Sequence, residues 1–285
     1  MLVPEEVNYE IGELSIHGLS VGDNEAPILL CLHGWLDNAA SFVPMFPYLK
    51  SHRVVAIDWL GHGFSSHRSK DAHYHFIDWV YDLLQLFEVN QWHNIDIVGH
   101  SMGGMVASAF SAAFPEKVKS LTLLDSIGLL SASSEETTEQ LRTGMLSRLA
   151  GRNKQKKYHS SIESAVQARL MASDLTKEAA ELIVKRGLTK ESEGFRWRAD
   201  SRLRAKSPYR LTAAQAQQFI KDIKTPVQLI YGDSGLDMVA KGLKSFGPLF
   251  QSFKCHQVKG GHHFHMEEAK TTAELIENFT NSQPN

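Results

Sequence analysis

The stretch DIVGHSMGGMVASAF, residues 96–110, changes from a strand pattern to a helix pattern at a single corner. The segment that leads into it, NIDIVG at residues 94–99, is short and rich in Ile and Val, as expected of a strand buried on both faces. After the corner, apolar and small residues recur at helical spacing. A sharp strand-to-helix reversal favours residues without a β-carbon, and three glycines surround this corner: Gly99, Gly103 and Gly104. The stretch therefore predicts a strand, a tight turn and a helix in immediate succession.

Ser101 stands at the joint between this strand and this helix. Residues 99–103 follow the G-x-S-x-G pattern of a nucleophile elbow, in which a strained turn holds a serine hydroxyl above the sheet and beside a helix N-terminus. The alternative is a purely structural turn, because glycine and serine are common residues. We interpret Ser101 as a nucleophile, since the strand and the helix flank the motif as this chemistry requires.

Composition excludes several classes of protein. The chain has 285 residues, 42% hydrophobic and 22% charged, with a formal net charge of −2, which is ordinary for a globular protein and gives no reason to expect a nucleic-acid partner. No stretch approaches the roughly twenty apolar residues of a membrane span, and the N-terminus lacks a basic segment followed by an apolar one. We expect a cytoplasmic protein with no membrane partner. Cys31 and Cys255 lie in strand-like runs without C-x-x-C spacing, which favours buried free thiols.

Strand-like and helical segments alternate along most of the chain. A hairpin over residues 9–22 is followed by six apolar runs with helical patterns between most of them. This alternation predicts a mostly parallel, doubly wound α/β sheet, whose ligands bind beyond the carboxyl ends of the strands. The candidate chemical residues all follow strand-like runs: His33, Asp58, Ser101, Asp125, residues 233–237 and His262.

The alternation stops between residues 127 and 208. This part reads as helices only, the last of them running through FRWRADSRLRA at residues 195–205. We predict a helical cap at residues 127–208, inserted after the sixth strand of the main sheet. The core domain then comprises residues 1–126 and 209–285. A cap that leaves the core at the catalytic end is expected to cover the site.

Four ordered motifs resemble those of the α/β-hydrolase superfamily: CLHGWLDNAASF (31–42), DWLGHGFSSH (58–67), GHSMGG (99–104) and GGHHFHMEEA (260–269). The first two, together with the end of the cap, are most similar to the serine hydrolase-like proteins. This resemblance implies the α/β-hydrolase fold, a Ser, Asp, His order of catalytic residues, and chemistry without a metal or organic cofactor.

His262 is the predicted general base, because an imidazole must take the serine proton and this histidine follows the last strand-like run. The imidazole needs an acid to fix its tautomer. Many relatives carry that aspartate three residues beyond the glycine that ends the preceding strand, but this position is Gly235 here. We expect a longer loop to bring Asp237 to the usual place, with Asp125 as the alternative acid. Asp233 is expected only to begin the turn.

Three histidines in HHFH, residues 262–265, raise the possibility of a metal site. No acidic or cysteine partner has a recognised ligand spacing, so no metal is predicted, and His263 and His265 are expected to pack or to face solvent. Oxyanion stabilisation is assigned to the backbone N–H groups of Met102 and Trp35. The resemblance gives His33 and Asp58 a role in organising the loops. The predicted pocket residues are His33, Trp59, His100, Phe264 and Met266.

The function predicted from these residues is hydrolysis of small to medium carboxylic esters through an acyl-serine intermediate, with a small-molecule ester as the partner. An acyl thioesterase or a C–C bond hydrolase would use the same triad, and a non-catalytic ligand-binding or interaction protein could retain the fold. A basic segment at residues 196–210 would attract an anionic substrate such as a CoA thioester, although arginines at a domain junction more often fix structure.

Overall fold

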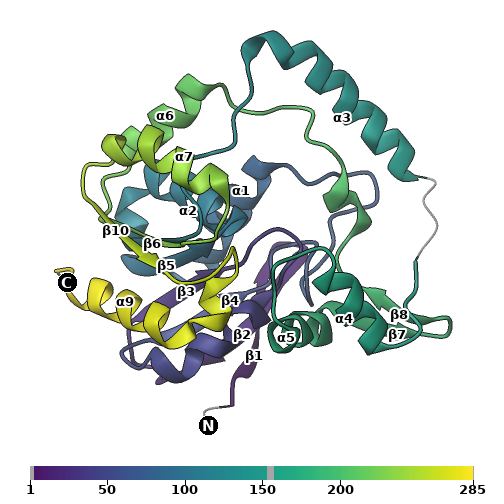
Figure 1. Cartoon of the computed structure of the whole chain (residues 1–285), viewed down its shortest axis with the longest axis horizontal. Helices are drawn as coiled ribbons and strands as arrows, with labels where there is room; N and C mark the ends of the chain where they lie inside the picture. Colours follow the sequence, from purple (N-terminus) through teal and green to yellow (C-terminus); the bar gives the residue numbers. More distant parts are fainter. Residues whose placement is uncertain (1–2, 153–156, 285) are drawn as a thin grey trace.

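An eight-stranded sheet forms the centre of the computed structural model, which describes residues 3–152 and 157–284 (Figure 1). The strand order is β1-β2-β4-β3-β5-β6-β9-β10. β1 and β2 form the predicted hairpin, β2 also pairs antiparallel with β4, and the remaining pairs are parallel. The strands are β1 (Glu5–Ile11), β2 (Leu14–Val21), β3 (Ile28–Leu32), β4 (Arg53–Ile57), β5 (Ile95–His100), β6 (Val118–Leu124), β9 (Val227–Gly232) and β10 (Phe253–Val258).

Helices cover both faces of this sheet, so its central strands are buried throughout. On one face, α1 and α2 pack with apolar sheet residues such as Leu32, Ile57 and Ile97. On the other face, the 3₁₀ segment η1 and helix α9 pack with the alternate residues of the same strands, such as Cys31 and Ala56. This is the doubly wound arrangement that the alternating pattern predicted. The helices of the core are α1 (Phe76–Val89), α2 (Met102–Ala113), α6 (Ala213–Asp222), α7 (Asp237–Phe246), α8 (Phe264–Glu267) and α9 (Ala269–Asn281), with η1 at Ala39–Tyr48.

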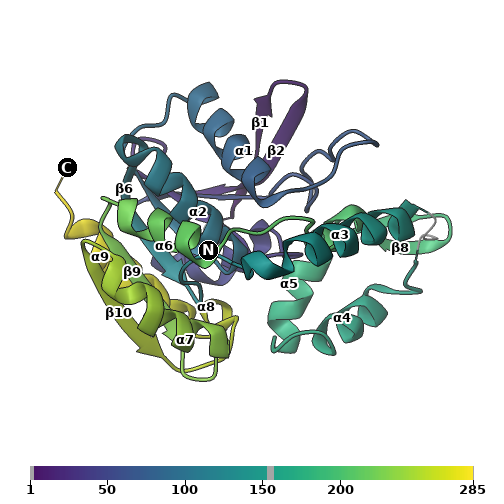
Figure 2. The same ribbon diagram turned by 90° about the horizontal axis from the view of Figure 1, so that it is seen from above.

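The long connection between β6 and β9 leaves the main sheet after its sixth strand. It contains α3 (Thr137–Arg152), α4 (Ile162–Leu170) and α5 (Lys177–Gly187), which lie away from α9 in both views (Figures 1 and 2). α4 and α5 have a small apolar core of their own, which includes Val166, Ile183 and Val184. One side chain of the main domain, Met266, joins this cluster. We call residues 127–208 the insertion.

The prediction of a last helix in the insertion, at residues 195–205, is wrong. Residues 188–197 form a two-stranded hairpin, β7 (Leu188–Glu191) with β8 (Gly194–Trp197), and the short 3₁₀ segment η4 (Ser201–Arg204) follows. Gly194 has φ +133°, a backbone angle that lets the chain reverse here. Phe195 and Trp197 of β8 then pack on the core of α4 and α5. Tertiary packing of these aromatic side chains therefore outweighs the helical pattern of the intervening basic residues.

The two cysteines differ in exposure. Cys31 is buried in the centre of the sheet, as predicted, whereas Cys255 is exposed on β10, which forms an edge of the sheet. The prediction of burial is wrong for Cys255, because only one neighbouring strand, β9, flanks β10. No helix in the described ranges combines the length and apolar character needed to cross a membrane.

Close packing at the start of α2 depends on its glycines. A β-carbon on Gly103 would overlap the backbone carbonyl oxygen of Leu32, at the end of β3. A β-carbon on Gly99 would lie 2.6 Å from the backbone of Gly104. Because these neighbours are backbone atoms rather than movable side chains, no rotamer change can relieve the overlap.

We predict that Gly103→Ala lowers the free energy of unfolding by about 3 kcal/mol or more, because the new methyl group must push the helix away from β3. Gly151→Ala is the matched control: Gly151 lies in α3, and an added β-carbon there meets no atom within 4 Å. The control is expected to raise stability by about 0.5–1 kcal/mol through helix propensity. Urea unfolding midpoints measure both changes, and equal midpoints for the two variants would contradict the packing argument.

Candidate active site

The turn that carries Ser101 is strained. Ser101 joins β5 to α2 with φ 51° and ψ −117°, a backbone conformation that residues other than glycine rarely adopt. Hydrogen bonds hold it there: the Ser101 N–H donates to the carbonyl of Leu124 at 3.1 Å, and the Ser126 hydroxyl donates to the Ser101 carbonyl at 2.8 Å. The backbone is thus fixed on both sides of the residue, while the Ser101 hydroxyl has no hydrogen bond to any described residue.

His262 is bonded to Asp125. Its Nδ1 lies 2.6 Å from Oδ2 of Asp125, a carboxylate that follows β6 and whose side chain is fully buried. The Leu236 N–H donates to the same oxygen at 3.1 Å. A proton on Nδ1 that is held by this carboxylate leaves the lone pair of Nε2 available, which is the tautomer that a general base needs.

Asp237, the first choice for the acid, does not reach His262. It is exposed and begins α7, in the first turn of the helix, where a carboxylate is favoured by the helix dipole. The loop before it is held tightly, since the N–H groups of Ser234 and Gly235 bond to the carbonyls of Gly260 and Gly232. The two additional residues are therefore used in a turn and in the start of a helix.

Because Gly235 has no side chain, it leaves room for Asp125, the alternative acid. A β-carbon on Gly235 would overlap Oδ1 of Asp125, so the carboxylate of Asp125 occupies the space into which a side chain at position 235 would project. Asp233 begins the turn, as predicted, and its carboxylate accepts from the N–H of Gly260 at 3.0 Å.

Ser101 and His262 line one cavity of about 640 Å³. Trp35 lies on the same wall, directly after Gly34, and a β-carbon on Gly34 would be 3.1 Å from Cβ of Ser101. Met102 is the first residue of α2, so its N–H has no acceptor within the helix. The backbone N–H of Trp35 likewise has no hydrogen bond within the described residues. Two unpaired N–H groups thus flank the serine.

The loop that carries Trp35 is held by His33 and Asp58. The Nδ1 of His33 lies 2.7 Å from the Gly34 carbonyl, and its Nε2 accepts from the Trp59 N–H at 3.0 Å. Complete burial lowers the pKa of His33 to about 4, so the ring is neutral at pH 7 and can accept this bond. Asp58 accepts from the backbone N–H groups of Ala39 and Phe64.

The predicted pocket residues separate into two groups. His100 lines the cavity, with His262 and Ser101. The other four lie outside the lining described for it: His33, Trp59 and Phe264 are fully buried in the main domain, and Met266 packs against the insertion. Their large side chains are part of the core, which is the usual position of such residues.

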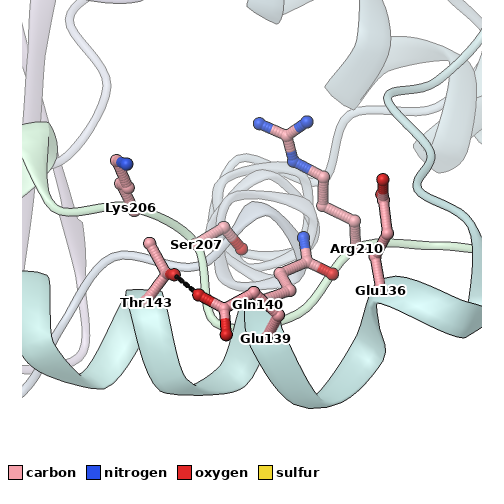
Figure 3. A pocket seen from close by; sticks show the side chains of 7 residues that line it. All are labelled: Glu136, Glu139, Gln140, Thr143, Lys206, Ser207 and Arg210. Carbon is pink, nitrogen blue, oxygen red and sulfur yellow. Dashed lines mark hydrogen bonds between the residues drawn. The ribbon is translucent and has the colours of Figure 1, made fainter.

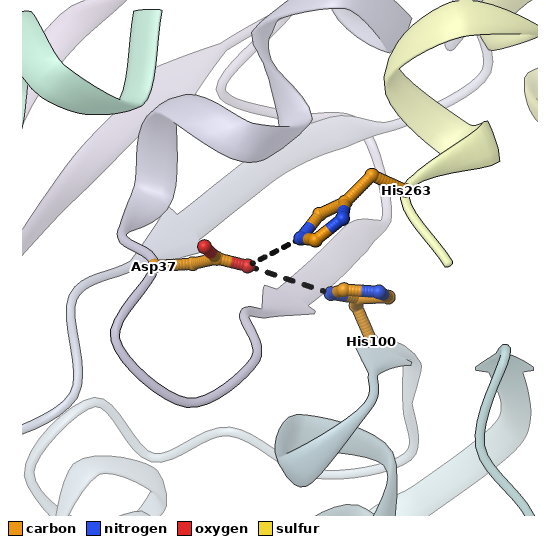
Figure 4. A group of neighbouring side chains, drawn as sticks. All are labelled: Asp37, His100 and His263. Carbon is orange, nitrogen blue, oxygen red and sulfur yellow. Dashed lines mark ion pairs between the residues drawn. The ribbon is translucent and has the colours of Figure 1, made fainter. Parts of the chain in front are cut away.

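An ion-pair network next to His262 was not predicted. His263 lies between two carboxylates. Its Nδ1 is 2.6 Å from Oδ1 of Asp174. Its Nε2 is 3.4 Å from Oδ2 of Asp37 (Figure 4). Burial alone would lower the pKa of His263, but the bonds to Asp174 and Asp37 outweigh it and raise the pKa to about 9. Arg169 of α4 pairs with Asp37 from the other side. His263 is therefore an imidazolium at neutral pH.

Asp37, His100 and His263 are close enough to surround a small cation, since their ligand atoms lie within 4.8 Å of one another. Asp37 comes from a distant part of the chain, which is why local spacing around HHFH did not reveal it. Asp37 is already paired with Arg169, and both nitrogens of His263 face carboxylates. A metal ion would have to displace the proton of His263, so these side chains fit an ion-pair network better than a metal site.

His265 is fully buried and packs against His100, with ring centroids 4.3 Å apart and the ring planes tilted by 40°. Burial lowers the pKa of His265 to about 3, so it packs as a neutral ring. Asp174 belongs to the loop between α4 and α5, and it also accepts a hydrogen bond from the backbone N–H of His262. No motif in the sequence marks Asp174 or Arg169, because their partners are about ninety and 130 residues away along the chain.

Comparison with known proteins identifies the family of this chain. Residues 27–269 match the family described as alpha/beta hydrolase fold. The serine hydrolase-like protein of Danio rerio is 31% identical over 95% of this chain and 86% of its own. The crystal structure of the hypothetical protein PA1622 from Pseudomonas aeruginosa PAO1 superposes with a TM-score of 0.90 at 33% identity, covering 97% of this chain and 98% of the other. A thioesterase domain from the curacin biosynthetic pathway has a TM-score of 0.87 at 26% identity, over 97% and 99% of the two chains. This protein belongs to the alpha/beta hydrolase fold family.

Proposed function

We propose that this protein is a serine hydrolase that cleaves small to medium carboxylic esters, with Ser101 as nucleophile, His262 as general base and Asp125 as the acid. The observation that carries the proposal is the bond between His262 and Asp125 at the wall of a cavity that Ser101 also lines. The strained conformation of Ser101 supports it, because such strain is concentrated at functional positions.

The reaction follows from these positions. Nε2 of His262 takes the proton from Ser101 as its oxygen attacks the ester carbonyl, and the N–H groups of Met102 and Trp35 stabilise the oxyanion. The same proton then passes from His262 to the departing alkoxide, which leaves an acyl-serine. Water, deprotonated by His262, attacks this ester. As the bond between the acyl carbon and the Ser101 oxygen breaks, His262 gives the proton to that oxygen, and the acid product is released. Asp125 holds the ring in place and stabilises the imidazolium, without taking the proton itself.

An acyl thioesterase is the second candidate, because the same triad attacks thioesters and the thioesterase domain from the curacin pathway is similar over nearly the whole chain. Oxygen esters and thioesters of one acyl chain, compared by kcat/KM, separate the two functions. A higher kcat/KM for the thioesters would favour this second candidate.

We also propose that residues 127–208 act as a cap over this cavity. This proposal is supported by the lining of the cavity, which includes residues of α4, β8 and the α4–α5 loop. Bonds between the cap and the core near the site include Asp174 to His262, Arg169 to Asp37, and Arg186 to Asp58. A cap attached at these points would shape the substrate cavity rather than swing freely.

The acid is tested by a matched pair of variants. Asp125→Asn is expected to lower kcat by up to about ten-thousand-fold, because His262 loses the group that holds its tautomer, whereas Asp237→Asn should change kcat less than threefold or so.

Ser101→Ala and His262→Ala are each expected to abolish turnover, and combining them should add little, since the residues act as a unit. Ester hydrolysis measures all of these variants, with circular dichroism to check folding. A larger loss for Asp237→Asn would return the acid to α7.

The space shared by positions 125 and 235 offers a second test of the acid. Asp125→Gly removes the carboxylate and suits the φ of 41° at this position. Adding Gly235→Asp places a new carboxylate next to the vacated space, and we expect kcat to recover about tenfold or more relative to Asp125→Gly alone. No recovery in a well-folded double variant would mean that the two positions are not equivalent.

Attachment of the cap is expected to depend on pH through His263. Its pKa in the folded protein, about 9, is above its ordinary value of 6.5, so its contribution to stability is complete below about pH 6.5 and is lost as the pH rises through 9. Between pH 6.5 and 9.5, wild-type protein should lose about 1–3 kcal/mol more of its unfolding free energy than His263→Gln loses. Urea unfolding at both pH values measures this difference, and parallel losses in the two proteins would contradict it.

A further inference from the structure

The basic segment at residues 196–210 has structural partners for most of its charges. Arg196 binds Glu191, the guanidinium of Arg198 donates to the Leu188 carbonyl, and Arg202 binds Asp200. Lys206 and Arg210 line a separate cleft beside α3, and Glu136 and Glu139 line the same cleft (Figure 3). The expectation that this segment mainly fixes structure therefore holds for Arg196, Arg198 and Arg202.

Arg204 is the member of the segment that lines the catalytic cavity. It ends η4, and the described residues give its guanidinium no carboxylate partner and no hydrogen bond to a carbonyl. The guanidinium carbon of Arg204 lies 5.9 Å from the centroid of the Trp35 ring. Trp35 is itself anchored, because its Nε1 donates to the carbonyl of Leu203 at 3.2 Å. The side chain of Arg204 is thus supported beside the site without being neutralised.

The other charges of the cavity wall are paired with one another. Asp37 pairs with Arg169, and Asp174 pairs with the imidazolium of His263. These four groups form a network with no net charge, so Arg204 is the charged side chain of this lining that has no charged partner among the described residues. The side chain of Arg204 is exposed to solvent. Partial burial lowers its pKa, and the positive charge of Arg169 lowers it further.

The rest of the lining is mostly apolar or small. It includes Trp35, Leu36, Ala168, Ala172, Trp197, Ala199 and Leu236. A cation at the wall of a largely apolar cavity is a typical device for orienting a ligand, because a few polar groups fix its position while apolar groups supply contact area. A planar guanidinium is well suited to a carboxylate, sulfate or phosphate, which can accept two parallel hydrogen bonds.

We propose that Arg204 binds an anionic group carried by the substrate, so that the ester cleaved at Ser101 is an acidic one. This inference rests on the proposed hydrolase function and narrows its substrate class. The anion sits either on the acyl part or on the alcohol part of the ester, and in both cases it lies at the Trp35 and Arg204 side of the cavity when the carbonyl is at Ser101.

The test uses two matched pairs of esters. On the acyl side, mono-p-nitrophenyl adipate is compared with p-nitrophenyl hexanoate, and on the alcohol side, 4-carboxyphenyl hexanoate is compared with phenyl hexanoate. Each pair differs chiefly by one carboxylate. The quantity measured is the ratio of kcat/KM for the charged ester to kcat/KM for the neutral one, in wild type, Arg204→Gln, Arg204→Lys and the control Arg210→Gln.

In at least one pair, Arg204→Gln is expected to lower this ratio about tenfold, as for the loss of one hydrogen bond to a charged group. Arg204→Lys should keep part of the ratio, and Arg210→Gln should leave it unchanged, because Arg210 lines the other cleft. Raising the salt concentration should lower the wild-type ratio but not that of Arg204→Gln. Ratios equal in wild type and Arg204→Gln for both pairs would overturn the proposal.

Binding separates this proposal from the hydrolase function on which it rests. In Ser101→Ala protein, which cannot turn over, calorimetry with the four esters should give tighter binding of a charged ester, and Arg204→Gln in that background should remove the preference. If wild type cleaves none of the esters but Ser101→Ala binds a charged ester more tightly than its neutral partner, the hydrolase proposal fails and the anion site stands. If neutral and charged esters bind Ser101→Ala equally, the anion site fails, whatever the activity.

Discussion

The close approach of α2 to the end of β3 is the constraint on which the rest of the site depends. Gly103 allows the helix to begin against the carbonyl of Leu32, and Ser101, two residues earlier, has φ 51°. The strain at Ser101 is held by bonds to Leu124 and from Ser126, both on the β6 side of the sheet. The same packing puts Gly34 beside Ser101, so the loop after β3 lies next to the start of α2. A small change in this contact would move Ser101, Met102 and Trp35 together.

The insertion and the core share the residues around His262. Asp174 accepts from the backbone of His262 and pairs with the ring of His263, so one carboxylate of the insertion holds both neighbouring histidines. Asp37, in the loop that precedes η1, is reached by His263 from one side and by Arg169 from the other. The position of His262 is thus coupled to attachment of the insertion. Arg204 lines the same cavity and has no charged partner among the described residues.

The parts of the structure that depend on local sequence were predictable. The hairpin at β1 and β2, the parallel strands and the corner at Ser101 follow from apolar periodicity and from glycines at a tight turn. The place of His262 after the last strand was also predictable, because parallel strands present their carboxyl ends at one edge of the sheet.

Features that depend on contacts between distant segments were not predictable. Loop length alone suggested Asp237, but the bonds of Ser234 and Gly235 close that loop early, and Asp125 fills the space above Gly235. The hairpin at β7 and β8 depends on Phe195 and Trp197 packing against α4 and α5, which no local pattern encodes. Asp37, Arg169 and Asp174 carry no motif, since each acquires its role only from a partner on another element.

Covalent labelling of Ser101 tests the central claim most directly. The account predicts that a fluorophosphonate probe adds once to folded wild-type protein, that peptide mapping finds the adduct on Ser101, and that unfolding in urea before labelling prevents the reaction. The reason is that an activated serine requires the assembled His262 and Asp125 pair, and a hydroxyl in an unfolded chain does not react. Absence of an adduct in well-folded protein, or an adduct on a different residue, would contradict the account.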